Sequence, residues 1–488
     1  MLRTLGRVAA LAAAVSLAAP AAAAPSALKP CRVDGIPNEL LCGSLPRPLD
    51  PARPDGVKID VHYLVVPALA RNKQPDAVLI LAGGPGQSAI GVAPRVLQRL
   101  SRLNNRRELV FIDQRGTGKS APLECLDDSR PANTEQLDTA AQMRRLDACR
   151  ATLEKLPYGR DGGLRFFTTT IAMQDMDAVR EQLGVPQWNL VGGSYGTRAA
   201  LEYLRQFPTR VRRTVIDGVA PPDMVLPASF SPDTQAALDK LITANTATYP
   251  QLRDDWQKLL ASLPRAVTVA QPLTGEPVHI NVDRELLLRA VRGPLYQPAL
   301  AAALPAALHA AAAEGRFDGL FGLTNAFSSN KGMKLATGMH FSVVCAEDYP
   351  RLADATDAPG ADFGRLDAEL YTRVCKTWPR GDVPAAFYTL PPAPSPVLVL
   401  SGGADPVTPP RHGERVARAL AQGHAERVQH VVVAESGHGV MAVACLRDVM
   451  FRFVDAKTDA AALPQDASCA TRIPRPTAFQ PVQRGATP

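Results

Sequence analysis

Short apolar runs alternate with amphipathic stretches in two parts of this chain. The runs with the length and bounding turn residues of β-strands lie at residues 57–68, 77–84, 108–116, 188–194, 211–218, 396–406 and 427–437. The later runs are continuously apolar, which is typical of strands covered on both faces. Stretches with helical spacing lie at residues 168–184, 195–208, 411–421 and 440–454. This alternation predicts an α/β fold in which helices cover a mostly parallel sheet.

A region of different character, residues 222–390, interrupts the alternation. Ala- and Leu-rich helical segments dominate it, for example residues 297–315, and strand patterns are scarce. We therefore predict that residues 25–221 and 391–488 form the two parts of one core, and that residues 222–390 are inserted as a helical cap. The proline-rich end of the chain, residues 472–488, is expected to be an irregular tail.

The first 24 residues have the three-part layout of a secretory signal. Two arginines precede the apolar stretch VAALAAAVSLAA, and small residues follow it. This stretch is shorter than the roughly 20 apolar residues that a membrane-spanning helix needs, and no later stretch has that length. We predict a signal peptide over residues 1–24 and an exported protein, periplasmic or secreted, without a membrane span.

The charge of the chain is diffuse. Lys and Arg outnumber Asp and Glu by 54 to 47, and the basic residues are scattered along the sequence. Nucleic-acid binding usually requires basic residues that cluster on one face or along one helix. We therefore expect no nucleic acid as a partner.

The eight cysteines fall into four local pairs, and none belongs to a C-x-x-C motif. A zinc site or a thioredoxin-like redox motif is thus not indicated, and disulfides are expected in an exported protein. The alternative is eight buried free thiols. The predicted pairs are Cys31–Cys42, Cys125–Cys149, Cys345–Cys375 and Cys445–Cys469.

A serine flanked by glycines stands between an apolar run and a helical stretch. The segment Gly192-Gly193-Ser194-Tyr195-Gly196 matches G-x-S-x-G in the strand-to-helix context that the motif requires. Small residues two places before and after the serine avoid collisions in the strained turn that exposes a nucleophile. We predict that Ser194 is a nucleophile; the alternative is an ordinary tight turn.

A serine hydroxyl needs a base to accept its proton, and the chain offers eight histidines. Only His438 directly follows the last predicted strand and lies between glycines, at a strand end where α/β folds place their chemistry. Asp405 ends the preceding strand, and the order Ser194, Asp405, His438 is the order of the catalytic triad in α/β-hydrolases. Asp217, at the end of the strand after Ser194, is the alternative acid, and a turn-capping residue otherwise.

Negative charge develops on the attacked carbonyl oxygen, and two N–H donors are needed to stabilise it. The residue after the nucleophile, Tyr195, should supply one of them. The glycine turn at residues 82–86 should supply the other. Because Pro85 has no N–H, Gly84 is the first candidate and Gly83 the second.

Taken together, the motifs resemble those of a known group of enzymes. The segments AGGPGQS, FIDQRGTGKS, GGSYGT, GADPVTPP and SGHG, in this order, are similar to those of the proline iminopeptidase and tripeptidyl aminopeptidase group of α/β-hydrolases. The resemblance covers roughly residues 30–470, and the C-terminal part is similar to the group's TAP-like C-terminal domain. It implies an α/β-hydrolase fold with a helical cap, and aminopeptidase or tripeptidyl-peptidase activity without a metal or other cofactor. One departure is Ala82, where the group's turn often begins with histidine, and this argues mildly against a strict proline iminopeptidase.

Exopeptidases of this group hold the free ammonium of the substrate with a carboxylate. By analogy with the group's cap carboxylates, Glu347 is the candidate, and a solvated acidic pair with Asp348 is the alternative. We expect a serine exopeptidase that removes short N-terminal segments from peptides with a free N-terminus, through an acyl-enzyme. The alternatives are an esterase or other acyl hydrolase with the same triad, and a catalytically silent binding protein on a hydrolase scaffold.

Overall fold

A nine-stranded sheet forms the centre of the protein in a computed structural model, which describes residues 28–125, 139–270, 274–328 and 334–481. The strand order is β1-β2-β3-β5-β4-β6-β7-β10-β11. The strands are β1 Lys29–Val33, β2 Ile36–Pro48, β3 Lys58–Val66, β4 Ala77–Leu81, β5 Leu109–Ile112, β6 Trp188–Gly193, β7 Val211–Asp217, β10 Val397–Gly402 and β11 Val428–Val433. The pairs from β1 to β5 are antiparallel and those from β5 to β11 are parallel, so the sheet is mostly parallel, as predicted. The predicted signal peptide lies outside the described residues.

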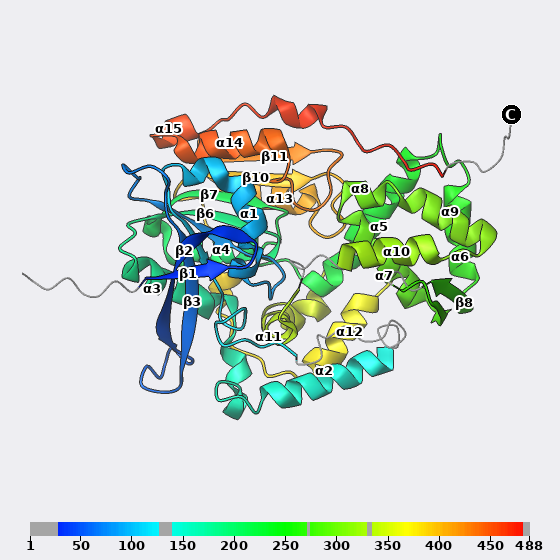
Figure 1. Ribbon diagram of the computed structural model, residues 1–488, viewed down its shortest axis with the longest axis horizontal. Helices are drawn as coiled ribbons and strands as arrows, with labels where there is room; N and C mark the ends of the chain where they lie inside the picture. The colour runs from blue at the N-terminus through cyan, green and yellow to red at the C-terminus, as the bar shows by residue number, and fades with distance from the viewer. Residues whose placement is uncertain (1–27, 126–138, 271–273, 329–333, 482–488) are drawn as a thin grey trace, which may run out of the picture.

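Helices cover both faces of the sheet, and each face has its own apolar core (Figure 1). One face packs against α3 Thr169–Gln182, α4 Tyr195–Gln206 and α13 Pro410–Leu420, and the other against α1 Ala89–Asn104 and α14 Ala444–Asp455. In β4, Leu79 and Leu81 point to the first face, and Val78 and Ile80 to the second. Strands buried on both faces need a continuous apolar run, which explains the pattern seen in the sequence. No helix among the described residues is long and apolar enough to cross a membrane.

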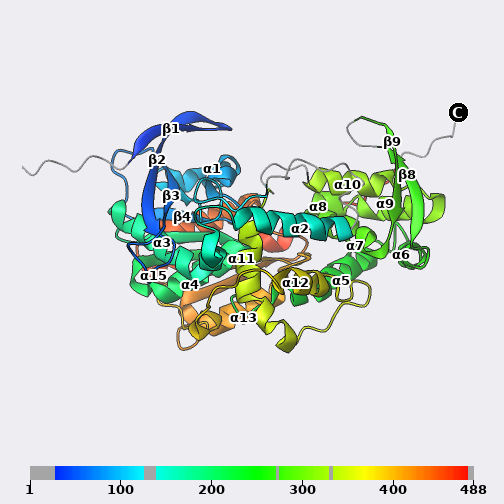
Figure 2. The same ribbon diagram turned by 90° about the horizontal axis from the view of Figure 1, so that it is seen from below.

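The segment that we call the cap, residues 222–390, lies between β7 and β10 in the sequence. Because these strands are parallel neighbours, the chain leaves the sheet after β7 and returns beside it. The cap helices are α5 Leu226–Ala244, α6 Leu252–Ala261, α7 Arg284–Leu295, α8 Pro298–Ala301, α9 Leu304–Glu314, α10 Asp318–Ser328, α11 Thr337–Glu347 and α12 Leu366–Cys375. Helices α5 to α10 enclose a separate apolar core that includes Trp256, Leu287 and Leu308. Figures 1 and 2 show these helices beside the sheet, with α11 and α12 between them and the core. Helix α2, Thr139–Leu153, runs along the lower edge of the molecule in Figure 1.

Several elements differ from the sequence-based expectation. The helix predicted over residues 297–315 is divided into α8 and α9, because Pro305 in the first turn of α9 cannot continue a preceding helix. The cap contains a short antiparallel sheet, β8 Arg265–Ala270 with β9 Pro277–Val282. The edge pair of β1 and β2 was not predicted either, since much of it is exposed and its polar residues hide the strand pattern.

Four disulfides pair all eight cysteines in the predicted combinations. Cys31–Cys42 joins β1 to β2, and Cys345–Cys375 joins α11 to α12. The other two, Cys125–Cys149 and Cys445–Cys469, close loops of similar length. Each cross-link limits the freedom of the unfolded chain and so favours the folded state.

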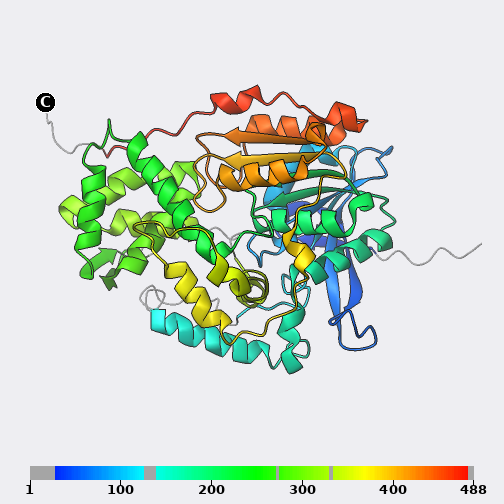
Figure 3. The same ribbon diagram turned by 180° about the vertical axis from the view of Figure 1, so that it is seen from behind.

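The described part of the C-terminal segment, residues 473–481, is irregular as expected and connects the core to the cap. Arg475 forms an ion pair with Glu435, which follows β11. Farther along, the Phe479 N–H donates to the carbonyl oxygen of Ala302 in the cap, and its own carbonyl oxygen accepts from the Tyr249 hydroxyl. Figure 3 shows the segment running along the edge of the core to the cap helices.

Candidate active site

Ser194 stands at the turn between β6 and α4 with φ 55° and ψ −127°, a backbone conformation that side chains rarely adopt. A Cβ on Gly192 would lie 2.4 Å from the Gly196 carbonyl oxygen, and one on Gly196 would lie 2.1 Å from the Leu81 carbonyl oxygen. Both positions therefore require glycine, as the sequence argument expected. A Cβ on Gly193 would meet only an ordinary contact at 3.5 Å. The turn is thus the sharp elbow that exposes a serine hydroxyl at the end of a strand.

Asp405 and His438 form a hydrogen-bonded pair at the ends of β10 and β11. The distance from His438 Nδ1 to Asp405 Oδ2 is 2.8 Å. Asp405 Oδ1 accepts from the N–H groups of Val407 and Thr408, and Oδ2 also accepts from the Thr408 hydroxyl at 2.7 Å. Because a carboxylate accepts, Nδ1 of His438 carries the proton and Nε2 is left as the basic atom.

Asp217, the alternative acid, has a different role. Its Oδ1 accepts from the Val440 N–H at 3.0 Å and its Oδ2 from the Met441 N–H at 2.7 Å. It therefore holds the loop after His438, and its carboxylate oxygens are bonded to this backbone rather than to the imidazole. Burial raises the pKa of Asp217 to about 6, although both N–H groups oppose the shift.

The end of β7 brings the serine and the histidine together. The Ser194 N–H donates to the carbonyl oxygen of Asp217 at 2.9 Å. A Cβ on the next residue, Gly218, would lie 3.1 Å from Cε1 of His438. Among the described residues, no hydrogen bond joins the Ser194 hydroxyl to His438. In unliganded enzymes this contact is often long and tightens when substrate binds.

Opposite shifts of pKa accompany the Asp405–His438 pair. Burial disfavours the charged form of His438, but the Asp405 carboxylate outweighs it, and the pKa of His438 lies above its ordinary value. Burial of Asp405 raises its pKa, yet His438 and the backbone N–H groups prevail and lower it overall. His438 keeps 16% of its side-chain surface exposed while Asp405 keeps none, so the imidazole is the accessible member of the pair.

Two backbone N–H groups flank the Ser194 turn without a partner in the part of the chain that the structure describes, those of Gly84 and Tyr195. The Gly83 N–H, in contrast, donates to Oε1 of Gln87 at 3.1 Å. Of the two glycine candidates, Gly84 is thus the one whose N–H has no partner among the described residues. The turn also lies against the serine, because a Cβ on Gly83 would be 3.2 Å from Ser194 Cβ. The two N–H groups thus lie on the two segments that adjoin Ser194, the glycine turn and the start of α4.

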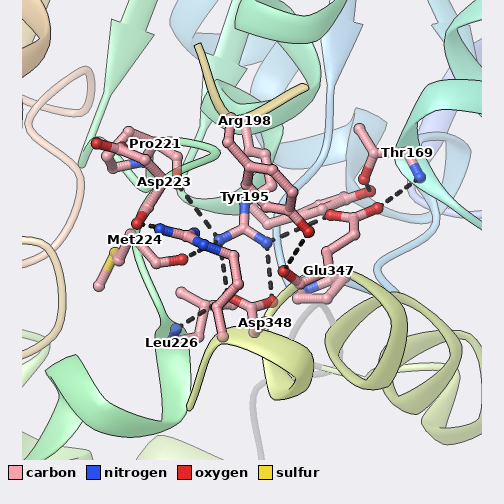
Figure 4. A network of polar contacts seen from close by, with 12 residues as sticks. Thr169, Tyr195, Arg198, Pro221, Asp223, Met224, Leu226, Glu347 and Asp348 are labelled. Carbon is pink, nitrogen blue, oxygen red and sulfur yellow. Dashed lines mark hydrogen bonds and ion pairs between the residues drawn. The ribbon is translucent and has the colours of Figure 1, made fainter. Parts of the chain in front are cut away.

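Glu347 lies at the end of α11 in a fully buried network (Figure 4). Its Oε1 accepts from the Thr169 N–H at 2.7 Å, and its Oε2 lies 3.3 Å from Nη1 of Arg198. Asp348 binds the same guanidinium through both oxygens, at 2.9 and 3.0 Å. Burial raises the pKa of Glu347 to about 7, and Arg198 partly opposes the shift. The side chain has no exposed surface, so the structure gives no support to the expected contact between Glu347 and a substrate ammonium.

Arg198→Met should destabilise the protein by about 3–5 kcal/mol, because it leaves the buried carboxylates of Glu347 and Asp348 without their cation. The midpoint of urea unfolding measures this loss. Arg418→Met, which breaks the exposed pair with Glu414, is the matched control and should change the midpoint little. Equal midpoints for Arg198→Met and wild type would contradict the assigned role.

Sequence reasoning missed three residues around the site. Thr408 contacts both Asp405 and His438, the latter at 3.0 Å from Nδ1. Tyr296 belongs to the cap, and its carbonyl oxygen accepts from the backbone N–H of His438 at 2.9 Å. The Tyr296 ring lies edge-on to the His438 imidazole, with 5.2 Å between the ring centroids. His340 contacts the glycine turn. Only Thr408 had a signal in the sequence, as the hydroxyl residue three places after the acid.

No group of three His, Cys, Asp or Glu side chains among the described residues is arranged to hold a metal ion. The site is thus built from a serine, an imidazole, a carboxylate and two backbone donors. This set can support nucleophilic attack on a carbonyl carbon, with proton transfer through the imidazole.

Comparison with protein families agrees with this geometry. The family described as alpha/beta hydrolase fold matches residues 76–443, a span from β4 to the loop after His438. The chain is an α/β hydrolase.

Curated relatives of this hydrolase include peptidases. It is 26% identical over 446 residues to the serine protease Hip1 of Mycobacterium tuberculosis, covering 83% of this chain and 84% of that protein. It is 30% identical over 281 residues to the tripeptidyl aminopeptidase of Streptomyces lividans, covering 50% of this chain and 49% of that protein. The family and these relatives identify the hydrolase as a serine hydrolase, and they confirm its resemblance to the proline iminopeptidase and tripeptidyl aminopeptidase group.

A solved structure is also similar to this chain over most of its length. The proline iminopeptidase of Mycobacterium smegmatis matches with 17% identity and a TM-score of 0.38, covering 84% of this chain and 97% of that chain.

Proposed function

We propose that this α/β hydrolase is an exported serine exopeptidase that removes short N-terminal segments from peptides. The observation that carries the proposal is the Asp405–His438 pair, at 2.8 Å, beside a serine held at φ 55° in the strand-to-helix elbow. The relatives named serine protease and tripeptidyl aminopeptidase support a peptide as the substrate.

In the proposed reaction, Ser194 Oγ attacks the scissile carbonyl carbon while Nε2 of His438 takes its proton. The carbonyl oxygen becomes an oxyanion that accepts from the N–H groups of Gly84 and Tyr195. His438 then passes its proton to the leaving amine, the C–N bond breaks, and an ester on Ser194 remains. Water, deprotonated by His438, attacks this ester. His438 then returns the proton to Ser194 Oγ as the C–O bond breaks, which releases the N-terminal segment and the free serine. Asp405 holds the Nδ1–H tautomer and stabilises the imidazolium in each step.

Export is supported by the four disulfides, which persist in oxidising compartments. The signal-like segment at residues 1–24 has the composition expected of an exported protein. We propose a periplasmic or secreted location for the mature chain.

A panel of chromogenic substrates tests the peptidase assignment. It holds Pro-, Ala-, dipeptidyl and tripeptidyl p-nitroanilides, N-blocked versions of each, and short p-nitrophenyl esters, with Ser194→Ala as control. The proposal predicts Ser194-dependent release from free-amine anilides that is lost when the amine is blocked. Turnover of esters alone, whether or not an amine is free, would instead indicate a general acyl hydrolase.

The pH dependence of kcat/KM should have an acid limb set by His438, which acts as a base only when neutral. Because Asp405 raises the pKa of His438 above its ordinary value of about 6.5, activity should fall from a higher pH than an unpaired histidine would give. Asp405→Asn should move this limb to lower pH. A pH profile of the residual activity measures the shift, and an unmoved limb would exclude His438 as the titrating group.

A further inference from the structure

The glycine turn that carries the Gly84 N–H is held by the cap. The Ala336 N–H donates to the Gly86 carbonyl oxygen at 2.9 Å, and a Cβ on Gly86 would lie 2.9 Å from the Ala336 carbonyl oxygen. Nδ1 of His340, one turn into α11, lies 3.1 Å from the Pro85 carbonyl oxygen. The turn and the start of α11 are therefore in direct backbone and side-chain contact.

The partners of His340 fix its proton on Nδ1. A carbonyl oxygen only accepts, so Nδ1–H must be the donor to Pro85. Nε2 is then an acceptor, and the Tyr371 hydroxyl lies 2.7 Å from it, in position to donate. Burial lowers the pKa of His340, although the Pro85 contact opposes this, which agrees with a neutral ring. Tyr371 thus orients the imidazole, and the imidazole orients the peptide between Pro85 and Gly86.

The helix that carries Tyr371 is fixed to the helix that carries His340. The disulfide Cys345–Cys375 joins α11 to α12 close to this hydrogen bond, and the rings of His340 and Tyr371 are 5.8 Å apart. Figure 2 shows α11 and α12 side by side between the core and the outer cap helices. The His340 imidazole therefore belongs to one of two helices, α11 and α12, that a disulfide joins, and not to a loop.

The other end of α11 is connected to α4, the helix that begins with the second proposed donor, Tyr195. Asp348, directly after the helix, binds Arg198 of α4, and α4 begins with Tyr195 (Figure 4). One cap helix thus contacts both the turn of Gly84 and the helix of Tyr195. Helix α11 is therefore one of the elements that hold the segments of both proposed donors.

We propose that His340 is a positioning residue for the oxyanion hole: through Pro85 it holds the glycine turn so that the Gly84 N–H meets the charge that develops beside Ser194. This inference rests on the proposed function, which assigns the donors to Gly84 and Tyr195. An oxyanion donor is effective only about 2.7–3.1 Å from the charged oxygen, so a small displacement of the turn weakens it. His340 itself does not contact the reacting atoms.

Two substitutions separate the donor at Nδ1 from the bulk of the ring. Asparagine places an amide N–H near the position of Nδ1, whereas glutamine places it near Nε2. His340→Gln should lower kcat about 10- to 100-fold with little change in KM, and His340→Asn should retain most of kcat. Tyr371→Phe, which removes the orienting hydroxyl, should give a smaller loss than His340→Gln.

The substrate for this test is p-nitrophenyl acetate, because its hydrolysis uses the oxyanion hole whether or not the enzyme prefers peptides. Binding of trialanyl aldehyde, which forms a tetrahedral adduct with a serine, should weaken in His340→Gln in parallel with kcat. Binding of trialanine, which forms no oxyanion, should stay as in wild type. Thermal unfolding of each variant shows whether the fold is retained.

The outcomes distinguish the two proposals. Wild-type kcat and aldehyde affinity in folded His340→Gln would overturn the positioning role, as would equal losses in the Asn and Gln variants. If His340→Gln does not fold, unchanged kcat in Tyr371→Phe overturns it instead. A wild-type protein without Ser194-dependent turnover would overturn the proposed function itself.

Discussion

Ser194→Ala should lower kcat by about 10⁶-fold, because no other group in the site can form the acyl-enzyme. KM should change little, since the hydroxyl makes its main contribution in the transition state. The stability should also be retained, because alanine meets the same backbone conformation, at φ 55°, with a smaller side chain. Steady-state kinetics on the best substrate of the anilide and ester panel measures the loss.

A second serine provides the control for this variant. Ser401 in β10 lies 2.9 Å from Nε2 of His430, so it is also a serine paired with a histidine. It is fully buried and lies within β10 rather than at an elbow, so its replacement by alanine should leave kcat near the wild-type value. A comparable loss in Ser401→Ala, or activity retained in Ser194→Ala, would contradict the assignment of the nucleophile.

Asp405→Asn should lower kcat by about 10⁴-fold with the fold retained. An amide can present its N–H₂ to the imidazole, which would favour the wrong tautomer of His438 and remove the charge that stabilises the imidazolium. Asp217→Asn is the matched comparison, because Asp217 is equally buried but bonds the backbone of Val440 and Met441. We expect a much smaller loss in kcat there, and the reverse ranking would exchange the roles of the two acids.

The sheet could be predicted from the sequence because its central strands are buried on both faces. A run such as Ala77–Leu81 is then apolar at every position, and it is hard to mistake for a surface element. The elbow could also be predicted from the sequence, because close backbone contacts require its glycines and these glycines lie within one short segment. That Asp405 and His438 lie together could be predicted from their places after strands, whose ends a parallel sheet brings to one edge.

The contacts that the sequence could not reveal join residues that are far apart in the chain. The carboxylate of Glu347 could in principle bind a substrate ammonium. Its charge is instead paired with Arg198, which lies on α4, the helix after the nucleophile. Nothing in the segment around Glu347 reveals that pairing. The same holds for His340, whose partner Pro85 belongs to the glycine turn of the core. Contacts between cap and core depend on how the inserted segment folds back, which no local pattern encodes.

The choice between Gly84 and Gly83 as the second donor could be predicted only in part from the sequence. The sequence excluded Pro85 as a donor and ranked the two glycines. The structure adds a contact from the side chain of Gln87, which accepts from the Gly83 N–H and so favours Gly84. A side-chain contact four residues away is short in sequence, but its direction depends on the conformation of the turn.

The most direct test of the account is labelling with a fluorophosphonate, which reacts with serines activated as nucleophiles, followed by mass mapping of the modified peptide. We expect one adduct, on Ser194, that is absent from Ser194→Ala and forms far more slowly in His438→Ala. Both variants should be shown to be folded. An adduct on a different serine, or no adduct on the folded wild-type protein, would contradict the claim that Ser194 is the nucleophile activated by Asp405 and His438.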